Sequence, residues 1–279
     1  MPRHAGHVAR RRFGQNFLVD AHYIRRIVDA VAPQPGETVV EIGPGLAALT
    51  PSLVERAGHV TALEIDRDLA ARLAADFPPE RLTLIVGDAL EYDFGDLGPG
   101  LRVVGNLPYN ISSPLLFHLA AHRHVLRDIH VMLQREVVAR MTASPGTADY
   151  GRLTVMLQVS FAVTRLFTVP AGAFRPVPKV ESAVARLVPL GAAAPHVADA
   201  ALFARLVSAS FGQRRKTLRN ALASLCDGDA LLRAGIDPAA RGETLSVDQF
   251  VQLANQLAAA HASAGSGHDG EMPPTRKSW

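Results

Sequence analysis

The sequence has almost no cysteine, no cluster of metal ligands and no long apolar run. Among its 279 residues Cys226 is the only cysteine, so no disulfide can form within the chain. No set of cysteines and histidines has the spacing of a zinc site, and we expect no metal. No window approaches the roughly 18 apolar residues of a membrane-spanning helix, and the N-terminus lacks the apolar core of a secretory signal. These absences predict a cytoplasmic protein with no membrane partner.

Positive charge is only slightly in excess, but it is concentrated in two segments. The formal net charge is +3 at pH 7. Residues 1–26 hold six arginines against one aspartate, and residues 203–219 hold five cations and no acid. Two solvated faces would explain this, but so would a surface that follows phosphates. The candidate nucleic-acid-binding residues are Arg10, Arg11, Arg12, Arg214, Arg215, Lys216 and Arg219.

Short β-branched runs alternate with amphipathic segments through the first half of the chain, after a helix that Asp20 is placed to cap. This alternation predicts an α/β fold with a mostly parallel, Rossmann-like sheet. Ligands of such sheets bind beyond the carboxyl ends of the strands. The predicted strands cover 38–43, 59–66, 82–88, 101–106 and 128–133.

The later part of the chain follows another pattern. Two strands joined by a proline-rich link predict a hairpin at the end of the sheet, at 161–169 and 181–190. A linker and three helices then predict a small, all-helical C-terminal domain, with helices at 201–211, 215–225 and 246–260. We expect a large domain over 1–192, a small helical domain over 193–262 and a disordered tail over 263–279.

A glycine-rich turn follows the first predicted strand. Gly43 and Gly45 stand between strand and helix, where missing side chains let a ligand approach the backbone. Glu64 ends the second strand, where a ribose-binding acid is expected, and Asp88 ends the third, placed to meet an adenine amine. Each acid alone could be a helix cap or turn residue. Together they predict a nucleoside-containing cofactor, and the turn also fits a nicotinamide dinucleotide.

The tetrapeptide Asn-Leu-Pro-Tyr, residues 106–109, follows the fourth strand. A dehydrogenase needs a proton donor or acceptor such as His or Lys, and none is convincingly placed here. The Asn106 oxygen and the Leu107 carbonyl can instead accept the two hydrogens of an adenine amine, which directs its lone pair toward an electrophilic methyl group. Tyr109 can stack on a flipped base, and Phe174 is the candidate for its other face, unless it is simply a core residue. The pattern indicates amine methylation.

Seven ordered motifs between about residue 9 and 260 resemble the ribosomal RNA adenine dimethyltransferase family, in particular its small-subunit branch. They are RRRFGQNFLVD, EIGPG, LEID, GDAL, NLPYNISSP, AFRPVPKVESAVARL and FGQRRKTLRNAL. The resemblance implies transfer of methyl groups from S-adenosylmethionine to the N6 atoms of two adjacent adenosines near the 3′ end of 16S rRNA, within the 30S subunit. It also implies a link to late 30S assembly, and we expect a monomer.

The resemblance implies roles for individual residues. Asn106 and Leu107 would engage the target amine, with Tyr109 and Phe174 flanking the base. The implied cofactor-binding residues are Gln15, Asn16, Leu18, Gly43, Glu64, Asp88, Ala89 and Asn106. At position 47 the family's third glycine is replaced by Ala47, which costs stability if its φ is positive.

Three alternatives remain at this point. A sister enzyme that dimethylates one adenosine of 23S rRNA would use the same chemistry. A 30S assembly factor that acts mainly by binding would need only the basic surfaces. A nicotinamide dehydrogenase would share the glycine-rich turn and Glu64.

Overall fold

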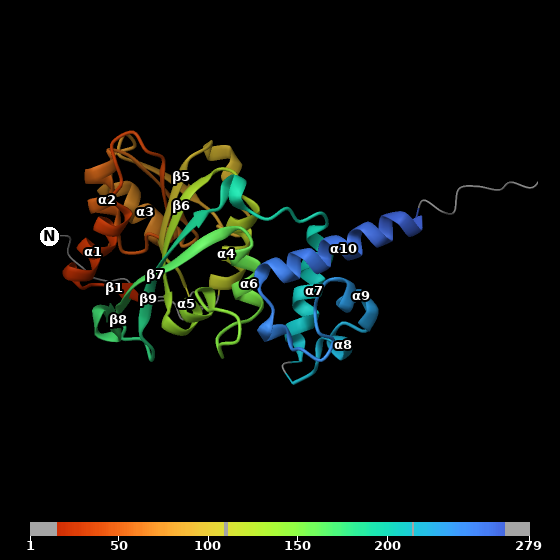
Figure 1. Ribbon diagram of the computed structural model, residues 1–279. Coiled ribbons are helices and arrows are strands. Elements are labelled where there is room, and N and C mark those ends of the chain that lie inside the picture. The colour runs from red at the N-terminus through yellow and green to blue at the C-terminus, as the bar shows by residue number, and fades with distance from the viewer. Residues whose placement is uncertain (1–15, 109–110, 214, 266–279) are drawn as a thin grey trace, which may run out of the picture. The chain divides into compact units, whose positions relative to one another are not determined.

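The computed structural model describes residues 16–108, 111–213 and 215–265 (Figure 1). Within these ranges the chain forms two compact units. The first comprises the residues up to Ser144 together with Met156–Ala194, and the second comprises Pro145–Val155 together with the residues from Pro195 onward. Residues 145–155 therefore fold with the C-terminal helices, whereas the sequence predicts a continuous first domain. No helix in the described ranges is both long and apolar enough to span a membrane.

A seven-stranded sheet forms the centre of the first unit, in the order β4-β3-β2-β5-β6-β9-β7. The first five strands in this order are parallel, and β9 is antiparallel to both β6 and β7. This confirms the Rossmann-like sheet and the terminal hairpin, and it places β2 and β5 at the point where the strand order reverses. The strands are β2 (Val39–Ile42), β3 (Val60–Glu64), β4 (Leu82–Val86), β5 (Leu101–Asn106), β6 (Leu126–Gln134), β7 (Phe161–Val169) and β9 (Ser182–Pro189).

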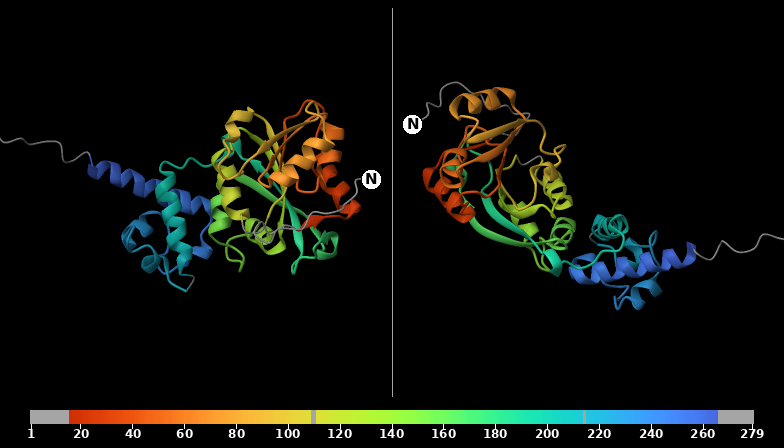
Figure 2. Two further views of the ribbon diagram at one scale, coloured as in Figure 1. Left: turned by 180° about the vertical axis from the view of Figure 1, so that it is seen from behind. Right: turned by 90° about the horizontal axis from the view of Figure 1, so that it is seen from above.

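Helices cover both faces of this sheet, with α1 and α2 on one side and α4 and α5 on the other (Figures 1 and 2). Asp20 caps α1 as predicted, because its carboxylate accepts a hydrogen bond from the His22 backbone at 2.8 Å. The helices and 3₁₀ turns are α1 (Ala21–Val31), α2 (Thr50–Ala57), α3 (Arg67–Asp76), η2 (Phe94–Leu97), α4 (Ser112–Ala121), α5 (Arg135–Met141), α6 (Arg152–Gln158), η3 (Ala171–Ala173) and η4 (Gly191–Ala193).

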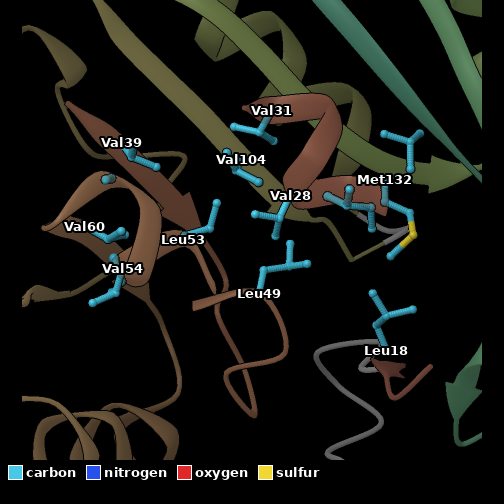
Figure 3. Packing of buried hydrophobic residues seen from close by; sticks show 14 of the residues in the cluster. Leu18, Val28, Val31, Val39, Leu49, Leu53, Val54, Val60, Val104 and Met132 are labelled. Carbon is cyan, nitrogen blue, oxygen red and sulfur yellow. The ribbon is translucent and has the colours of Figure 1, made fainter. Parts of the chain in front are cut away.

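Aliphatic side chains of α1 and α2 form the hydrophobic core on their face of the sheet (Figure 3). Val28 and Val31 of α1 and Leu53 of α2 are at most 1% exposed, and they belong to one cluster with Val39 and Val104 of the central strands. Burial of each such side chain contributes about 1.5–3 kcal/mol. This packing fixes β2 and β5, whose carboxyl ends carry the predicted site.

A buried ionic network joins the C-terminal end of α1 to the sheet. The Arg102 guanidinium donates hydrogen bonds to the Val31 carbonyl at 2.6 Å and to the Asp128 carboxylate at 3.0 Å. Asp128, fully buried, also accepts from Arg186 at 3.3 Å. His130 is 2% exposed, with Nδ1 3.7 Å from Asp128 Oδ1. Burial lowers the pKa of His130 to about 4, although the charge of Asp128 opposes the shift.

The second unit is helical over much of the part that the structure describes. Its elements are α7 (Ala200–Gly212), α8 (Leu218–Ala221), α9 (Gly228–Arg233), η5 (Gly242–Thr244) and α10 (Val247–Gly265). The predicted helix over 215–225 is wrong in extent. Leu218 and Leu222 are already fully buried, so one turn satisfies the apolar pattern, and Asp227 then caps α9 by accepting from Ala230 N at 2.8 Å.

Tyr150 holds residues 145–155 in the second unit. Its side chain is 1% exposed, and its hydroxyl donates to the Leu245 carbonyl at 2.8 Å. Its ring lies edge-on to Phe211, with the ring centres 5.9 Å apart. A buried aromatic ring with a satisfied hydroxyl is a strong anchor, which explains why this segment belongs with residues far along the chain.

Candidate active site

A cavity lies beyond the carboxyl ends of the parallel strands, at the reversal of strand order. Its walls come from the ends of β2, β3 and β5, the turn after β4 and the segment that contains β1 (Phe17–Leu18). The structure brings together most of the predicted site residues that it describes. Those that line the cavity are Asn16, Leu18, Gly43, Glu64, Asp88, Ala89, Asn106 and Leu107. Gln15 and Tyr109 lie outside the described residues.

The glycine-rich turn is left-handed at alternate residues. Gly43, Gly45 and Ala47 have φ values of 64°, 59° and 61°. A Cβ at Gly45 would lie 3.2 Å from the Phe17 ring, so this glycine permits close packing as well as positive φ. Ala47, where the resemblance implies a third glycine, thus occupies a position that disfavours a side chain.

Glu64 is oriented by two backbone donors. Its Oε2 accepts a hydrogen bond from Gly45 N at 3.1 Å, and its Oε1 accepts from Asp66 N at 2.8 Å. A carboxylate oxygen has two lone pairs, so each retains one that suits a hydroxyl of a ribose diol. Burial raises the pKa of Glu64 above its ordinary value, while the two backbone hydrogen bonds act in the opposite direction.

Asp88 and its neighbours supply the remaining surface for a base. One Asp88 oxygen accepts from Leu90 N at 2.9 Å, which fixes the side chain in the turn after β4. Its second oxygen can accept from an adenine amine. Ile65 also lines the cavity and is 47% exposed, which offers apolar surface to a flat ring. The sequence points to Asp88 but not to Ile65, because an isoleucine at a strand end is ordinary.

Asn106 is held at the end of β5 by a long-range contact. Its side-chain nitrogen donates to the Asn16 carbonyl at 3.1 Å, so the side-chain oxygen takes the acceptor role. Leu107 N donates to the Met132 carbonyl at 3.2 Å, which aligns the start of the Asn-Leu-Pro-Tyr turn with β6. The predicted pair of acceptors is therefore attached to rigid strand ends.

Gly105, directly before Asn106, lets β5 pack closely on β2, and the sequence analysis misses it. A Cβ at this position would lie 2.8 Å from Leu107 Cδ2 and 2.9 Å from the Ile42 carbonyl oxygen. Contacts this short require the backbone to move, so only glycine lets β5 approach β2 so closely. A glycine inside a predicted strand is the signal that could have revealed it.

Phe174 lies in a buried position, and its predicted role beside the target base stays a prediction. Phe174 is 1% exposed, belongs to the core cluster and is not among the residues that line the cavity. It lies in β8 (Phe174–Arg175), which pairs antiparallel with β1, opposite Leu18. Side chains alternate along a strand, so Arg175 is exposed and Phe174 points to the core.

Acidic groups dominate the electrostatics of the cavity. Glu41, Glu64 and Asp88 line it, and no lysine, arginine or histidine does so in the described part of the chain. Such a lining favours a cationic ligand over the pyrophosphate of a dinucleotide. Glu41, which directly precedes the glycine-rich turn, is 2% exposed and was not among the predicted cofactor-binding residues.

The described part of the basic surface lies in the second unit. Arg215, Lys216 and Arg219 are exposed, at the N-terminal end of α8 and within it. Arg10, Arg11, Arg12 and Arg214 lie outside the residues that the structure describes. No cluster of at least three histidine, cysteine or acidic residues in the described ranges has the arrangement of a metal site.

Comparison with known proteins decides the family. The model of the family described as Ribosomal RNA adenine dimethylase matches residues 6–259. The chain belongs to this family. The dimethylase is accordingly an rRNA adenine dimethyltransferase, with S-adenosylmethionine as its methyl donor. Membership confirms the family predicted from the seven motifs and removes the dehydrogenase alternative.

Relatives of the dimethylase match it over nearly the whole length of both chains. It is 60% identical to "Ribosomal RNA small subunit methyltransferase A" of Aromatoleum aromaticum, over 91% of this chain and 96% of the relative. A protein of the same name from Thiobacillus denitrificans is 58% identical, over 90% of this chain and 99% of the relative. These names indicate a small-subunit rRNA methyltransferase.

Solved structures share the fold of the dimethylase. A dimethyladenosine transferase from Plasmodium falciparum superposes with a TM-score of 0.77 at 24% identity, over 88% of this chain and 98% of that one. The 23S rRNA methyltransferase ErmE superposes with a TM-score of 0.66 at 29% identity, over 87% of this chain and 100% of that one. The fold prediction is confirmed.

Proposed function

We propose that this dimethylase modifies the N6 atoms of two adjacent adenosines near the 3′ end of 16S rRNA, adding two methyl groups to each. The curated relatives support the small-subunit substrate, since they are 60% and 58% identical, whereas the 23S enzyme is 29% identical. The observation that carries the proposal is the convergence of Asn106, Glu64 and Asp88 on one cavity without a basic residue in its described lining. The enzyme would act in the cytoplasm, where small subunits assemble.

The residues of the cavity fit the methyl donor group by group. Glu64 would accept hydrogen bonds from the ribose hydroxyls, and Asp88 with Ala89 would hold the adenine. Gly43 would let the methionine end approach the backbone, with Asn16, Leu18 and, in the segment before them, Gln15 completing the pocket. S-adenosylmethionine supplies a methyl group that is already electrophilic because it is bonded to a sulfonium.

Asn106 and Leu107 would make the target amine nucleophilic. The Asn106 side-chain oxygen and the Leu107 carbonyl would each accept a hydrogen bond from one N–H of the amine, so that the nitrogen lone pair turns out of the ring plane. Positioning and hydrogen bonding then contribute most of the rate enhancement, and a strong general base is not needed. Tyr109 remains the predicted stacking partner of the base.

The second unit would bind RNA through its basic surface. Arg215, Lys216 and Arg219 are exposed cations on one short stretch of chain, the arrangement that neutralises successive phosphates. Arg214 and the N-terminal Arg10, Arg11 and Arg12 would extend this surface. The division of labour is catalysis in the first unit and RNA binding in both basic segments.

Methylation of unmodified 30S particles tests the proposal. Purified enzyme and labelled S-adenosylmethionine would be incubated with unmethylated 30S particles and, separately, with 23S rRNA. Mass spectrometry of the digested RNA should locate two N6-dimethylated adenosines near the 3′ end of 16S rRNA and none in 23S rRNA. A single modified adenosine in 23S rRNA would contradict the proposal and favour the sister activity.

A further inference from the structure

Glu41 is a buried acid on a central strand with an unsatisfied oxygen. It lies in β2, and its backbone is in register with Ala62 of β3 and Val104 of β5. The residue is 2% exposed and lines the cavity. Glu41 Oε2 and Thr50 Oγ1 are both buried and neither has a partner with hydrogen-bond geometry in the described chain. A buried carboxylate without a hydrogen-bond partner or a counter-ion raises the free energy of the folded protein.

The charged side chains that share the cavity with Glu41 are acidic. Glu64 comes from the end of β3, and Asp88 comes from the turn after β4. From α2 the neighbouring group is the uncharged Thr50, and no cation lines this cavity in the ranges that the structure describes. Burial raises the pKa of Glu41 to about 7, with a further contribution from Glu64. The nearby Thr50 hydroxyl, although outside strict hydrogen-bond geometry, favours the charged form and opposes the shift.

The ligands of this cavity differ in charge before and after the reaction. The methyl donor carries an ammonium, a carboxylate and a sulfonium, whereas its thioether product has lost the sulfonium charge. We propose that Glu41 is a specificity-determining charge sensor, which releases its proton to solvent when a positively charged ligand fills the cavity and so favours the sulfonium donor over the uncharged thioether product. This inference rests on the proposed use of the cavity as the cofactor site.

The direction of the pH effect follows from charge. Above about pH 8 Glu41 is ionised before any ligand binds, so the donor gains the full attraction. As the pH falls through 7, donor binding must first remove the proton, and its affinity declines. The product removes the proton less effectively, so its affinity changes less. We expect the donor dissociation constant to rise about three- to tenfold from pH 8 to pH 6, since one pKa unit corresponds to tenfold, and that of the product to change by less than about twofold.

Calorimetry on the full-length enzyme tests this inference. S-adenosylmethionine and S-adenosylhomocysteine would be titrated at pH 6, 7 and 8, in pairs of buffers with different ionisation enthalpies, so that the protons released are counted. Near pH 7 the donor should release a substantial fraction of a proton and the product clearly less. Glu41→Gln should abolish both this difference and the pH dependence of the donor-to-product affinity ratio. Glu55→Gln, on the exposed surface of α2, is the matched control and should behave as the unmodified enzyme.

A second variant keeps the inference testable if Glu41→Gln does not fold. Thr50→Val removes the hydroxyl that opposes the shift, so proton release on donor binding should move to higher pH. Equal proton release for donor and product, or unchanged release in Glu41→Gln, overturns the charge sensor while the cofactor site stands. If neither ligand binds the unmodified enzyme, the proposed use of the cavity fails, and the charge sensor fails with it.

Discussion

The side-chain nitrogen of Asn106 donates a hydrogen bond to the backbone oxygen of Asn16, 3.1 Å away and 90 residues earlier in the chain. This one bond joins the end of β5 to the segment that precedes β1 and leaves the Asn106 oxygen as the acceptor. The acceptor for the target amine is therefore oriented before any substrate arrives, which is the preorganisation that favours a transition state.

Replacing Asn106 by aspartate should test this orientation. A carboxylate oxygen would face the Asn16 carbonyl, and two acceptors repel each other. We expect the single-turnover rate of methyl transfer to 30S particles to fall about 100-fold or more, the range for a lost transition-state hydrogen bond. Binding to 30S particles, measured by filter retention, should be unchanged. A rate within about threefold of the unmodified enzyme would disprove the role given to Asn106.

Ala47→Gly should stabilise the protein. Ala47 has a φ of 61°, which costs an L-residue with a side chain about 1–2 kcal/mol. The greater freedom of glycine in the unfolded chain offsets part of this cost, so urea unfolding should show a net gain of roughly 0.5–1 kcal/mol. Methyl transfer should be intact and cofactor affinity equal or tighter. Ala48→Gly, outside the left-handed region, should instead lose stability. A large loss of cofactor affinity in Ala47→Gly would contradict this account.

Gly105→Ala should disturb the fold at the site. The added Cβ would meet the Ile42 carbonyl at 2.9 Å, and a backbone atom cannot move aside as a flexible side chain does. We expect a loss of roughly 1–3 kcal/mol, as for other overpacked positions, measured by chemical denaturation without cofactor. Gly87→Ala is the control, since a Cβ there would meet no atom within 4 Å. Equal stability of the two variants would show that β5 can move away from β2 at little energetic cost, which would contradict the prediction.

Charge reversal on the basic surface should weaken RNA binding. Arg215→Glu combined with Lys216→Glu should lower affinity for 30S particles and reduce the salt slope by about one for each lost phosphate contact. Arg233→Glu, an exposed reversal on α9, should have a smaller effect. Filter binding over a series of salt concentrations measures both quantities. Unchanged binding in the double variant would remove the RNA-binding assignment.

If the protein acted mainly as an assembly factor, Asn106→Ala would preserve this binding and its cellular role.

His130 should make the protein sensitive to acid. Its pKa in the folded protein is about 4, against an ordinary value of 6.5. Between pH 4 and 6.5 the unfolded chain therefore binds a proton at His130 that the folded chain does not bind. The neutral, buried state of His130 contributes its full stabilisation above pH 6.5, and this stabilisation is lost as the pH falls from 6.5 toward 4. Denaturation midpoints between pH 7 and 4.5 should fall less steeply in His130→Gln than in the unmodified protein. His124→Gln, on the surface, should leave the slope unchanged.

Much of the site was predictable because strand ends are visible in a sequence. Gly43, Glu64, Asp88 and Asn106 each follow a β-branched run, and parallel strands bring such ends to one edge of the sheet. The N-cap at Asp20 was predictable for a similar reason, since it depends on local chemistry alone.

The remaining features depend on contacts between distant segments. The burial of Phe174 follows from the pairing of β8 with β1, which nothing in the local sequence announces. The left-handed conformation of Ala47 shows that a side chain at this position is strained, whereas the sequence alone gives that strain only on condition of a positive φ. The unsatisfied Oε2 of Glu41 likewise becomes visible only when three strands and α2 are assembled.

The association of residues 145–155 with the C-terminal helices has a consequence for biosynthesis. A ribosome synthesises this segment before β7 and β9, whereas the Phe211 ring and the Leu245 carbonyl that contact Tyr150 are synthesised after both strands. Tyr150 therefore cannot reach these two partners until residues 211 and 245 have been synthesised. We expect residues 145–155 to acquire their native packing only after that point, so a chain truncated before residue 211 should leave this segment without its partners.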